Sequence, residues 1–492
     1  MNYKLLFRIL SYVLLIEAGF LIAPTVVAAI NGEPLFPFII TIALLIAVSV
    51  PFLIKKPKNK RMYAKEGFVA VGLCWILMSV FGALPFVFSG SISNYIDALF
   101  EVVSGFTTTG ATVIDDVESL PKGILFWRSL THWLGGMGVL VLMLALFPGE
   151  NGSVIYLMRA EVPGPQKGKL VPKMRGTAII LYSIYIALTA VMVVCLIIAG
   201  LEPYHALVNA FSTAGTGGFS VLNNSIAGYG NPAVEWIIAV FMVVFSVNFN
   251  IYFFILVRKF KAVLKNEELR ALLALLFFST VTIAINVGRS GAFDSVHDCI
   301  RAAFFQVASL SSTTGFTTVD FTLWPEISKN LLVLLIFIGA SAGSTAGGIK
   351  ISRIIIILKT VRLRIKKMLK PREVIPLKLD GDSIPIEVGN SAINYISIYL
   401  VFFICSTILI GLNGKDLVTT LTSVLTCISN AGPALGEVGS AGNFADFSAF
   451  SKIVFSLIML FGRLEIIPMI IILSPSTWRG FTKGETAFSK KL

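Results

Sequence analysis

Long apolar stretches alternate with short polar segments along almost the whole chain. A helix needs roughly 20 mainly apolar residues to cross the core of a bilayer. Ten runs reach that length, and we predict that they are membrane spans at residues 7–30, 35–54, 67–90, 123–147, 176–201, 233–257, 270–288, 329–358, 390–412 and 450–474. Four shorter amphiphilic stretches, 95–110, 203–217, 297–314 and 416–431, are predicted to be re-entrant half-helices.

Composition supports an all-α polytopic membrane protein. Hydrophobic residues make up 56% of the chain and charged residues only 14%, against roughly 25% charged residues in a soluble domain. The five cysteines form no CxxC pair or zinc-site pattern, and neither HExxH nor a GxSxG elbow in a suitable context occurs. We therefore expect no enzyme, no cofactor, no transition metal and no nucleic-acid partner, although the net charge is +13.

The basic residues predict the orientation of the chain. With the N-terminus inside, 30 of the 40 Lys and Arg residues fall in inner loops or near the two ends. Cytoplasmic loops are enriched in these residues, so both termini are predicted to be cytoplasmic. The first apolar run is too long for the core of a cleaved signal peptide. The basic loop 359–378 can bind anionic lipid or dock a partner, but the topological rule alone is the favoured explanation.

The chain contains a fourfold internal repeat. Four Gly/Thr/Ser clusters align on Gly110, Gly218, Gly315 and Gly432, which are 108, 97 and 117 residues apart. Each cluster follows a half-helix and lies between two spans. We therefore predict two extra N-terminal helices followed by four helix–pore-loop–helix units around one pore. The predicted divisions are 1–66, 67–175, 176–269, 270–389 and 390–492.

The clusters predict a path for a cation. Non-helical backbone at membrane depth is tolerated only where it is buried or lines a water-filled cavity, and rings of carbonyls can replace the hydration shell of an ion. Tight helix packing through small residues is the alternative, but four clusters in register favour the ion path. The predicted filter residues are Thr108, Thr109, Gly110, Thr216, Gly217, Gly218, Thr313, Thr314, Gly315, Asn430, Ala431 and Gly432.

At these residues the sequence resembles the Trk/Ktr/HKT superfamily of potassium transporters. The matching motifs are TTTGAT at 107–112, GTGGFS at 215–220, STTGFT at 312–317 and SNAGP at 429–433, together with WLGGMG at 133–138 and GRLE at 462–465. The two extra N-terminal spans are similar to the Trk branch, whose membrane subunit is of the TrkH type. The fourth loop departs most from the pattern, through Asn430 and Pro433.

The resemblance carries several implications. It implies potassium uptake across a bacterial cytoplasmic (inner) membrane, with K⁺ as the bound and transported ion. Glycine at the key position of every loop goes with a preference for K⁺, whereas serine in the first loop goes with Na⁺ permeability. The resemblance also implies a homodimer with one pore per protomer and a cytoplasmic nucleotide-binding regulatory subunit, similar to TrkA.

The eighth predicted span is interrupted by ten small residues, 339–348. Each glycine costs a helix about 1 kcal/mol relative to alanine, so a broken helix beside a cavity is expected. The resemblance makes this segment an intramembrane gate below the filter; a close helix crossing is the alternative. The predicted gate residues are Gly339, Gly343, Ser344, Thr345, Gly347, Gly348 and Lys350.

Arg463 lies midway along the last predicted span. A charge there costs about 2.5–3.5 kcal/mol on insertion scales, so it should face protein or water. It is predicted to be a positive barrier in the pore, with a structural ion pair or a snorkelling side chain as the alternative. Glu465 is two residues further on, so it should point elsewhere.

Other polar residues give weaker indications. His132 can relay protons, but a hydrogen-bonded structural histidine is favoured. Asp97, Glu101 and Asp298 can concentrate cations at the outer mouth, or cap and solvate the half-helices. Glu17 has no evident partner in the sequence.

Two transport mechanisms fit the sequence. The favoured one is a gated, channel-like K⁺ path. The alternative is a K⁺ symporter coupled to H⁺ or Na⁺, which needs a titratable group or a second ion site along the path. The four loops contain no titratable side chain within the predicted filter.

Overall fold

The structure is a computed structural model that describes residues 2–54, 64–138, 174–373, 375–440 and 442–478. Helices dominate this described part, which confirms the predicted all-α class. The part of predicted span 123–147 beyond residue 138, and the basic loops around residues 55–61 and 159–173, lie outside it. The N-terminal helices α1 (Tyr3–Phe20), α2 (Ile22–Ile30) and α3 (Phe36–Ile54) pack along one edge of the molecule, beside α4 (Ala64–Gly82).

Each of the four units contains a first helix, a short pore helix, a loop and a second helix. The first helices are α4 with α5 (Leu84–Phe88), α10 (Met174–Ile198), α15 (Glu267–Arg289) and α19 (Ile386–Gly411). The pore helices are α6 (Tyr95–Phe106), α11 (Pro203–Gly215), α16 (Val296–Ser311) and α20 (Leu417–Ser429). The second helices begin with α7 (Lys122–Met137), α12 (Pro232–Ser246), α17 (Glu326–Ile338) and α21 (Ala449–Arg463).

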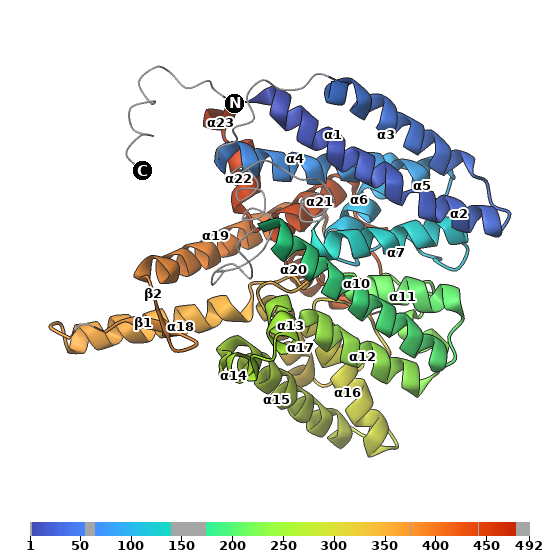
Figure 1. The fold of residues 1–492 in the computed structure, drawn as a ribbon. Helices are drawn as coiled ribbons and strands as arrows, with labels where there is room; N and C mark the ends of the chain where they lie inside the picture. Colours follow the sequence, from blue (N-terminus) through green and yellow to red (C-terminus); the bar gives the residue numbers. More distant parts are fainter. Residues whose placement is uncertain (1, 55–63, 139–173, 374, 441, 479–492) are drawn as a thin grey trace.

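The packing of these helices closes a ring. Each second helix contacts the pore helix of the following unit: α7 packs on α11, α12 on α16, and α17 on α20. The last unit returns to the first, since α21 packs on α6, and Figure 1 shows the red end of the chain beside the blue beginning. The four pore helices therefore surround a common centre.

Within the described residues, six helical segments are long and apolar enough to cross a membrane: Tyr3–Ile30, Phe36–Ile54, Lys65–Phe88, Gly176–Ile198, Glu267–Arg289 and Ile386–Gly411. The most apolar window of the last of these is only 22% buried within the protein. Such a bare apolar surface is unfavourable in water and costs nothing against lipid chains. The chain is therefore a multi-pass membrane protein.

The prediction of an unbroken span was wrong for 233–257 and 450–474, whereas the break that the sequence predicts within 329–358 is present. α12 meets α13 (Phe249–Leu256) at an angle of 90°, and the Asn248 side chain accepts a hydrogen bond from the Asn250 N–H to start the new helix. α17 ends at Ile338, and α21 ends at Arg463, before α22 (Ile467–Leu473). Hydropathy averaged over 20 residues does not register the breaks at Asn248 and Glu465, because one polar residue among apolar neighbours barely changes the mean.

The second helix of the third unit resumes as α18 (Ile351–Leu369), which carries much of the predicted basic loop and projects from the body (Figure 1). A hairpin of β1 (Leu377–Leu379) and β2 (Asp382–Ile384) follows it and is a small exception to the all-α prediction. Its turn is Asp380–Gly381, both with positive φ, and Asp-Gly is a strong hairpin signal. Asp380 accepts a hydrogen bond from the Glu267 N–H and so ties the hairpin to α15.

Candidate functional site

All four pore helices end in the same backbone motif. One residue at the end of each pore helix has a left-handed backbone conformation, with φ of 54–58°: Thr108, Thr216, Thr313 and Asn430. It directly follows the second and fourth pore helices and lies one residue further on after the first and third. The next N–H donates to the carbonyl five residues earlier at 2.8–2.9 Å, which is the Schellman arrangement of a helix C-terminus. Asparagine adopts this conformation readily, whereas it is strained for β-branched threonine. Strain of this kind persists only where the surrounding structure enforces it, and it clusters at functional sites.

The four aligned glycines close a ring of loops. Their φ values are 77–87°, and each one lies against a backbone carbonyl of the next loop, so that an added Cβ would collide with it. The facing pairs are Gly110 with the carbonyl of Gly217, Gly218 with that of Thr314, Gly315 with that of Ala431, and Gly432 with that of Thr109. The structure thus brings the twelve residues of the predicted filter together around one axis.

The ring opens into a polar cavity. All four glycines line a single cavity of about 130 Å³, with the hydroxyl-bearing residues Thr112, Ser220 and Thr317 beyond them. No carboxylate lies among the twelve loop residues, so the oxygen ligands that this ring can offer are carbonyls and threonine hydroxyls. Such ligands suit a weakly bound monovalent cation that must also leave.

One acidic side chain lines this cavity, and a second follows it in the sequence. Asp115 lines it and accepts a hydrogen bond from the Asn443 amide at 2.6 Å. The neighbouring Asp116 accepts one from the Asn223 amide at 2.8 Å, which lowers the pKa of that carboxyl. Both contacts join different units of the ring, and the charges favour cations near the mouth.

The predicted gate segment lies against the loops of the ring. Between α17 and α18, residues 339–350 form no helix, and Gly339, Gly343, Gly348 and Lys350 have positive φ. The Gly347 N–H donates to the Thr313 hydroxyl at 2.6 Å. The Gly348 N–H donates to the carbonyl of Ser429, one residue before Asn430, at 2.9 Å. A movement of this segment therefore has to break contacts with two of the four loops.

Side chains from other helices hold the same segment. The Glu268 carboxylate accepts hydrogen bonds from the Ala342 N–H at 2.7 Å and from the Ser352 N–H at 3.2 Å. It therefore ties the segment to the first turn of α18. The Thr345 hydroxyl donates to the carbonyl of Phe245 at 3.1 Å. Among the described residues, the Ser344 hydroxyl donates only to the carbonyl of Ser341 within the segment. The Lys350 ammonium donates to the carbonyl of Ala346.

Arg463, the predicted barrier, links the gate segment to the first unit. Its guanidinium donates to the carbonyl of Thr345 at 2.8 Å and to those of Gly135 and Gly136 at 2.6 and 2.7 Å. Glu465 points elsewhere, as expected, and pairs with Arg353 at 2.6 Å. The positive charge of Arg463 thus lies beside the gate segment and the end of α7.

Of the acidic residues predicted at the outer mouth, Glu101 is the clear correction. It is fully buried and neither faces solvent nor caps its helix, because an intramembrane arginine, Arg128, pairs with it. Asp97 pairs with Lys452 and Asp298 with Arg301. His132 bonds the carbonyl of Gly105 through Nδ1 and stacks on Phe219, in keeping with the structural alternative.

Glu17 is fully buried in α1, and its carboxylate has no hydrogen-bond partner among the described residues. One of its oxygens lies about 3 Å from where a Cβ on Gly82 would stand, at the junction of α4 and α5. Phe106 and Val102 of the first pore helix lie at the same place, so the carboxylate packs against the back of α6.

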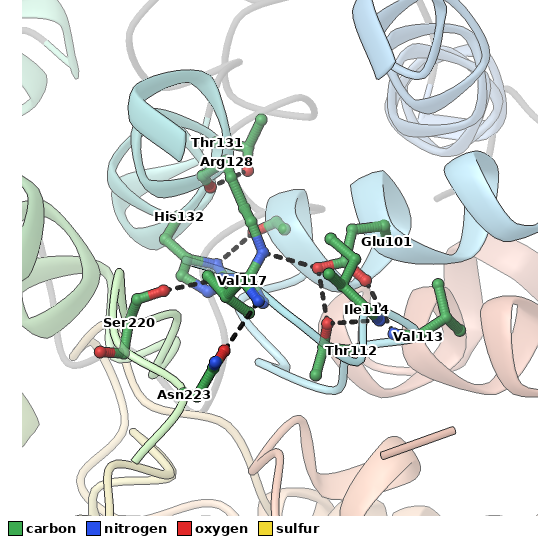
Figure 2. A network of polar contacts seen from close by, with 11 residues as sticks. Glu101, Thr112, Val113, Ile114, Val117, Arg128, Thr131, His132, Ser220 and Asn223 are labelled. Atoms are coloured by element: carbon green, nitrogen blue, oxygen red, sulfur yellow. Dashed lines mark hydrogen bonds and ion pairs between the residues drawn. The ribbon is translucent and has the colours of Figure 1, made fainter. Parts of the chain in front are cut away.

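Arg128 is the residue that the sequence analysis missed. Figure 2 shows it between the loops of the first two units, bonded to Glu101 at 2.6 Å and to the carbonyl of Ser220 at 3.0 Å. Arg128 also lines the cavity at the mouth of the ring. The available signal was a basic residue inside a predicted span, which by itself indicates a buried partner or a polar path.

Comparison with known proteins identifies relatives along the whole chain. The sequence model of the TrkH family, described as a cation transport protein, matches residues 35–479. The Trk system potassium uptake protein TrkH of Escherichia coli K12 is 35% identical over 487 residues, covering 97% of this chain and all of that protein. The potassium uptake protein TrkG of the same organism is 33% identical over 93% of this chain and 95% of its own length.

A solved structure agrees with these sequence matches. The crystal structure of the potassium transporter TrkH from Vibrio parahaemolyticus superimposes with a TM-score of 0.87 at 31% sequence identity. The match covers 97% of this chain and all of that one.

Proposed function

The chain belongs to the TrkH family of cation transport proteins, a family of transporters and not of enzymes, and we propose that it carries potassium ions into the cell. The path is channel-like and crosses the bacterial cytoplasmic membrane, with both termini on the cytoplasmic side. The observation that carries this proposal is the closed ring in which each loop's glycine faces a carbonyl of the next loop. Relatives named as potassium uptake proteins support K⁺ as the ion.

In this proposal the twelve loop residues form the selectivity filter. Their carbonyls replace the hydration shell of K⁺, and Gly110, Gly218, Gly315 and Gly432 permit both the backbone conformation and the close approach of neighbouring loops. Residues 339–350 act as the gate, because they bond directly to the bases of two loops. Arg463 is the barrier, supported by its place beside Thr345 of that segment.

The proposed assembly is a homodimer, with one pore in each protomer, that works with a cytoplasmic nucleotide-binding subunit similar to TrkA. The relatives are named as parts of a Trk system, which supports a further component. The second candidate is a K⁺ symporter coupled to H⁺ or Na⁺. The filter loops contain no titratable side chain, which favours the channel-like path.

Uptake of ⁸⁶Rb⁺ into proteoliposomes that contain the purified chain alone tests this function, with the membrane potential clamped and with K⁺ or Na⁺ as competitor. We expect uptake to follow the electrochemical gradient, to be blocked by K⁺ and to be little affected by Na⁺. Uptake that needs an imposed H⁺ or Na⁺ gradient would establish the symporter instead. Absence of K⁺ competition would contradict a potassium path.

Replacing Arg463 with alanine is expected to raise ⁸⁶Rb⁺ flux about fivefold. The variant removes a positive charge beside the path, and two unit charges 4 Å apart interact by about 1 kcal/mol even in water. It also removes the hydrogen bond that holds the carbonyl of Thr345. Arg463→Lys keeps the charge and serves as the control, with flux close to that of the unaltered protein. A folded Arg463→Ala protein with unchanged or lower flux would make Arg463 a structural residue.

A further inference from the structure

A buried ion pair lies directly behind the mouth of the loop ring. The Arg128 Nε and a Glu101 carboxylate oxygen are 2.6 Å apart, and the two side chains are only 3% and 0% exposed. Burying two charges costs about as much as their attraction returns, so such a pair is weak evidence for a stabilising role. Its contacts indicate what else it does.

The carboxylate of Glu101 holds the outgoing strand of the first loop. It accepts hydrogen bonds from the Thr112 hydroxyl and the Val113 N–H, both at 3.0 Å. These residues come two and three positions after the filter glycine Gly110. Glu101 itself lies on the pore helix α6, so it fixes the far end of the loop to the helix that precedes it (Figure 2).

The guanidinium of Arg128 holds the outgoing strand of the second loop. It donates to the carbonyl of Ser220 at 3.0 Å and lies 3.5 Å over the ring of Phe219. These residues are one and two positions after Gly218. The ion pair therefore joins the outer ends of two neighbouring filter loops, whose inner faces meet where Gly110 lies against the carbonyl of Gly217.

The other units place uncharged side chains at the position of Glu101. Nine residues before each filter glycine stand Glu101, Asn209, Gln306 and Ser423, all fully buried. Asn209 bonds to the Tyr229 hydroxyl, and Ser423 to the carbonyl of Thr420. The Gln306 amide has no hydrogen-bond partner among the described residues. The Glu101–Arg128 ion pair therefore makes the first unit of the ring differ from the other three, which have uncharged residues at this position.

We propose that the Glu101–Arg128 pair sets the discrimination between K⁺ and Na⁺ by fixing the spacing of the first two filter loops. Both are positioning residues, since their hydrogen bonds go to the loops, and the inference rests on the proposed potassium path. The pair has an electrostatic consequence as well. Arg128 lines the mouth, so Glu101 cancels a positive charge that would repel incoming cations.

Glu101→Gln and Arg128→Met separate the two effects in the ⁸⁶Rb⁺ assay with Na⁺ and K⁺ competition. Both variants are expected to lower the preference for K⁺ over Na⁺ roughly tenfold. Removing a residue that orients the ligands of an ion typically weakens ion binding by about that factor. Only Glu101→Gln leaves an uncompensated positive charge, so it alone should weaken the apparent affinity for Rb⁺. The double variant should recover that affinity but not the selectivity.

Asp97→Asn is the matched control. Asp97 lies one turn before Glu101 on the same pore helix and forms a different ion pair, with Lys452 at 2.8 Å. The variant breaks that pair. We expect its selectivity to equal that of the unaltered protein. Thr112→Val, which removes one hydroxyl and keeps the shape, supplies a milder test if the charge variants do not fold, with a loss of selectivity of about two- to threefold.

The outcomes are distinguishable from failure of the function itself. If the unaltered protein discriminates K⁺ from Na⁺ while folded Glu101→Gln and Thr112→Val keep the same ratio, the inference is wrong and the potassium path stands. If Asp97→Asn loses selectivity equally, the effect is general destabilisation and the inference is also wrong. If the unaltered protein shows no K⁺ preference, the proposed function fails first.

Discussion

Replacing Gly110 with serine is expected to lower the preference for K⁺ over Na⁺ by about tenfold or more. Gly110 has a φ of 80°, and an added Cβ would collide with the carbonyl oxygen of Gly217. A side chain in such a conformation costs about 1–3 kcal/mol, and each 1.4 kcal/mol is a factor of ten. The carbonyl cannot keep its position beside the new side chain, so the ring of oxygens must change. Competition of Na⁺ and K⁺ against ⁸⁶Rb⁺ uptake measures the result.

Gly90→Ser is the control for backbone strain. Gly90 belongs to the same unit and has a φ of 73°, but an added Cβ meets nothing within 4 Å. Its serine variant should therefore keep the selectivity of the unaltered protein and lose only stability. Equal selectivity for Gly110→Ser would contradict the assignment of the filter.

The contacts of an added Cβ also predict that serine substitutions in different loops differ in their effect on selectivity. A Cβ on Gly432 would come within 2.8 Å of the Thr109 carbonyl oxygen, a looser contact than that at Gly110. Serine at Gly432 is therefore expected to disturb selectivity less.

The helical architecture could be predicted from the sequence. Long apolar runs stand out at any averaging length, and the regular spacing of Gly110, Gly218, Gly315 and Gly432 shows the repeat. The breaks within the predicted spans 233–257 and 450–474 could not be predicted. Asn248 starts a new helix at a right angle, but one asparagine among phenylalanines and valines barely alters the mean hydropathy. The hairpin at Asp380–Gly381 had a clear turn signal, which a search for apolar spans passes over.

The candidate site could be located by repeat alignment, but its conformation could not. Intrinsic preference opposes a left-handed threonine at 108, 216 and 313, so only the packing of the whole ring produces it. The ion pair of Glu101 and Arg128 joins residues of two different helices, and no local sequence pattern connects them. A comparison of equivalent positions in the four units would have singled out Glu101 as the one charged residue among Asn, Gln and Ser.

Deletion of residues 343–347 is expected to raise ⁸⁶Rb⁺ flux of the chain alone by more than about tenfold. The deletion removes the contacts of Gly347 with Thr313 and of Thr345 with Arg463. Each hydrogen bond contributes about 1 kcal/mol, so losing several favours the open path by more than a factor of ten. The preference for K⁺ over Na⁺ should survive, because the carbonyls of the ring belong to other residues.

Ser344→Ala supplies the matched control inside the same segment. In the part of the chain that the structure describes, its hydroxyl bonds only to the carbonyl of Ser341. The variant therefore leaves the described contacts with the filter loops and with Arg463 in place, and flux should not change. A deletion protein that is folded and monodisperse but transports no faster would remove the gate from residues 339–350. Faster flux together with loss of K⁺ preference would instead make this segment part of the filter, since the hydrogen bond from Gly347 to Thr313 would then be what holds the third loop in shape.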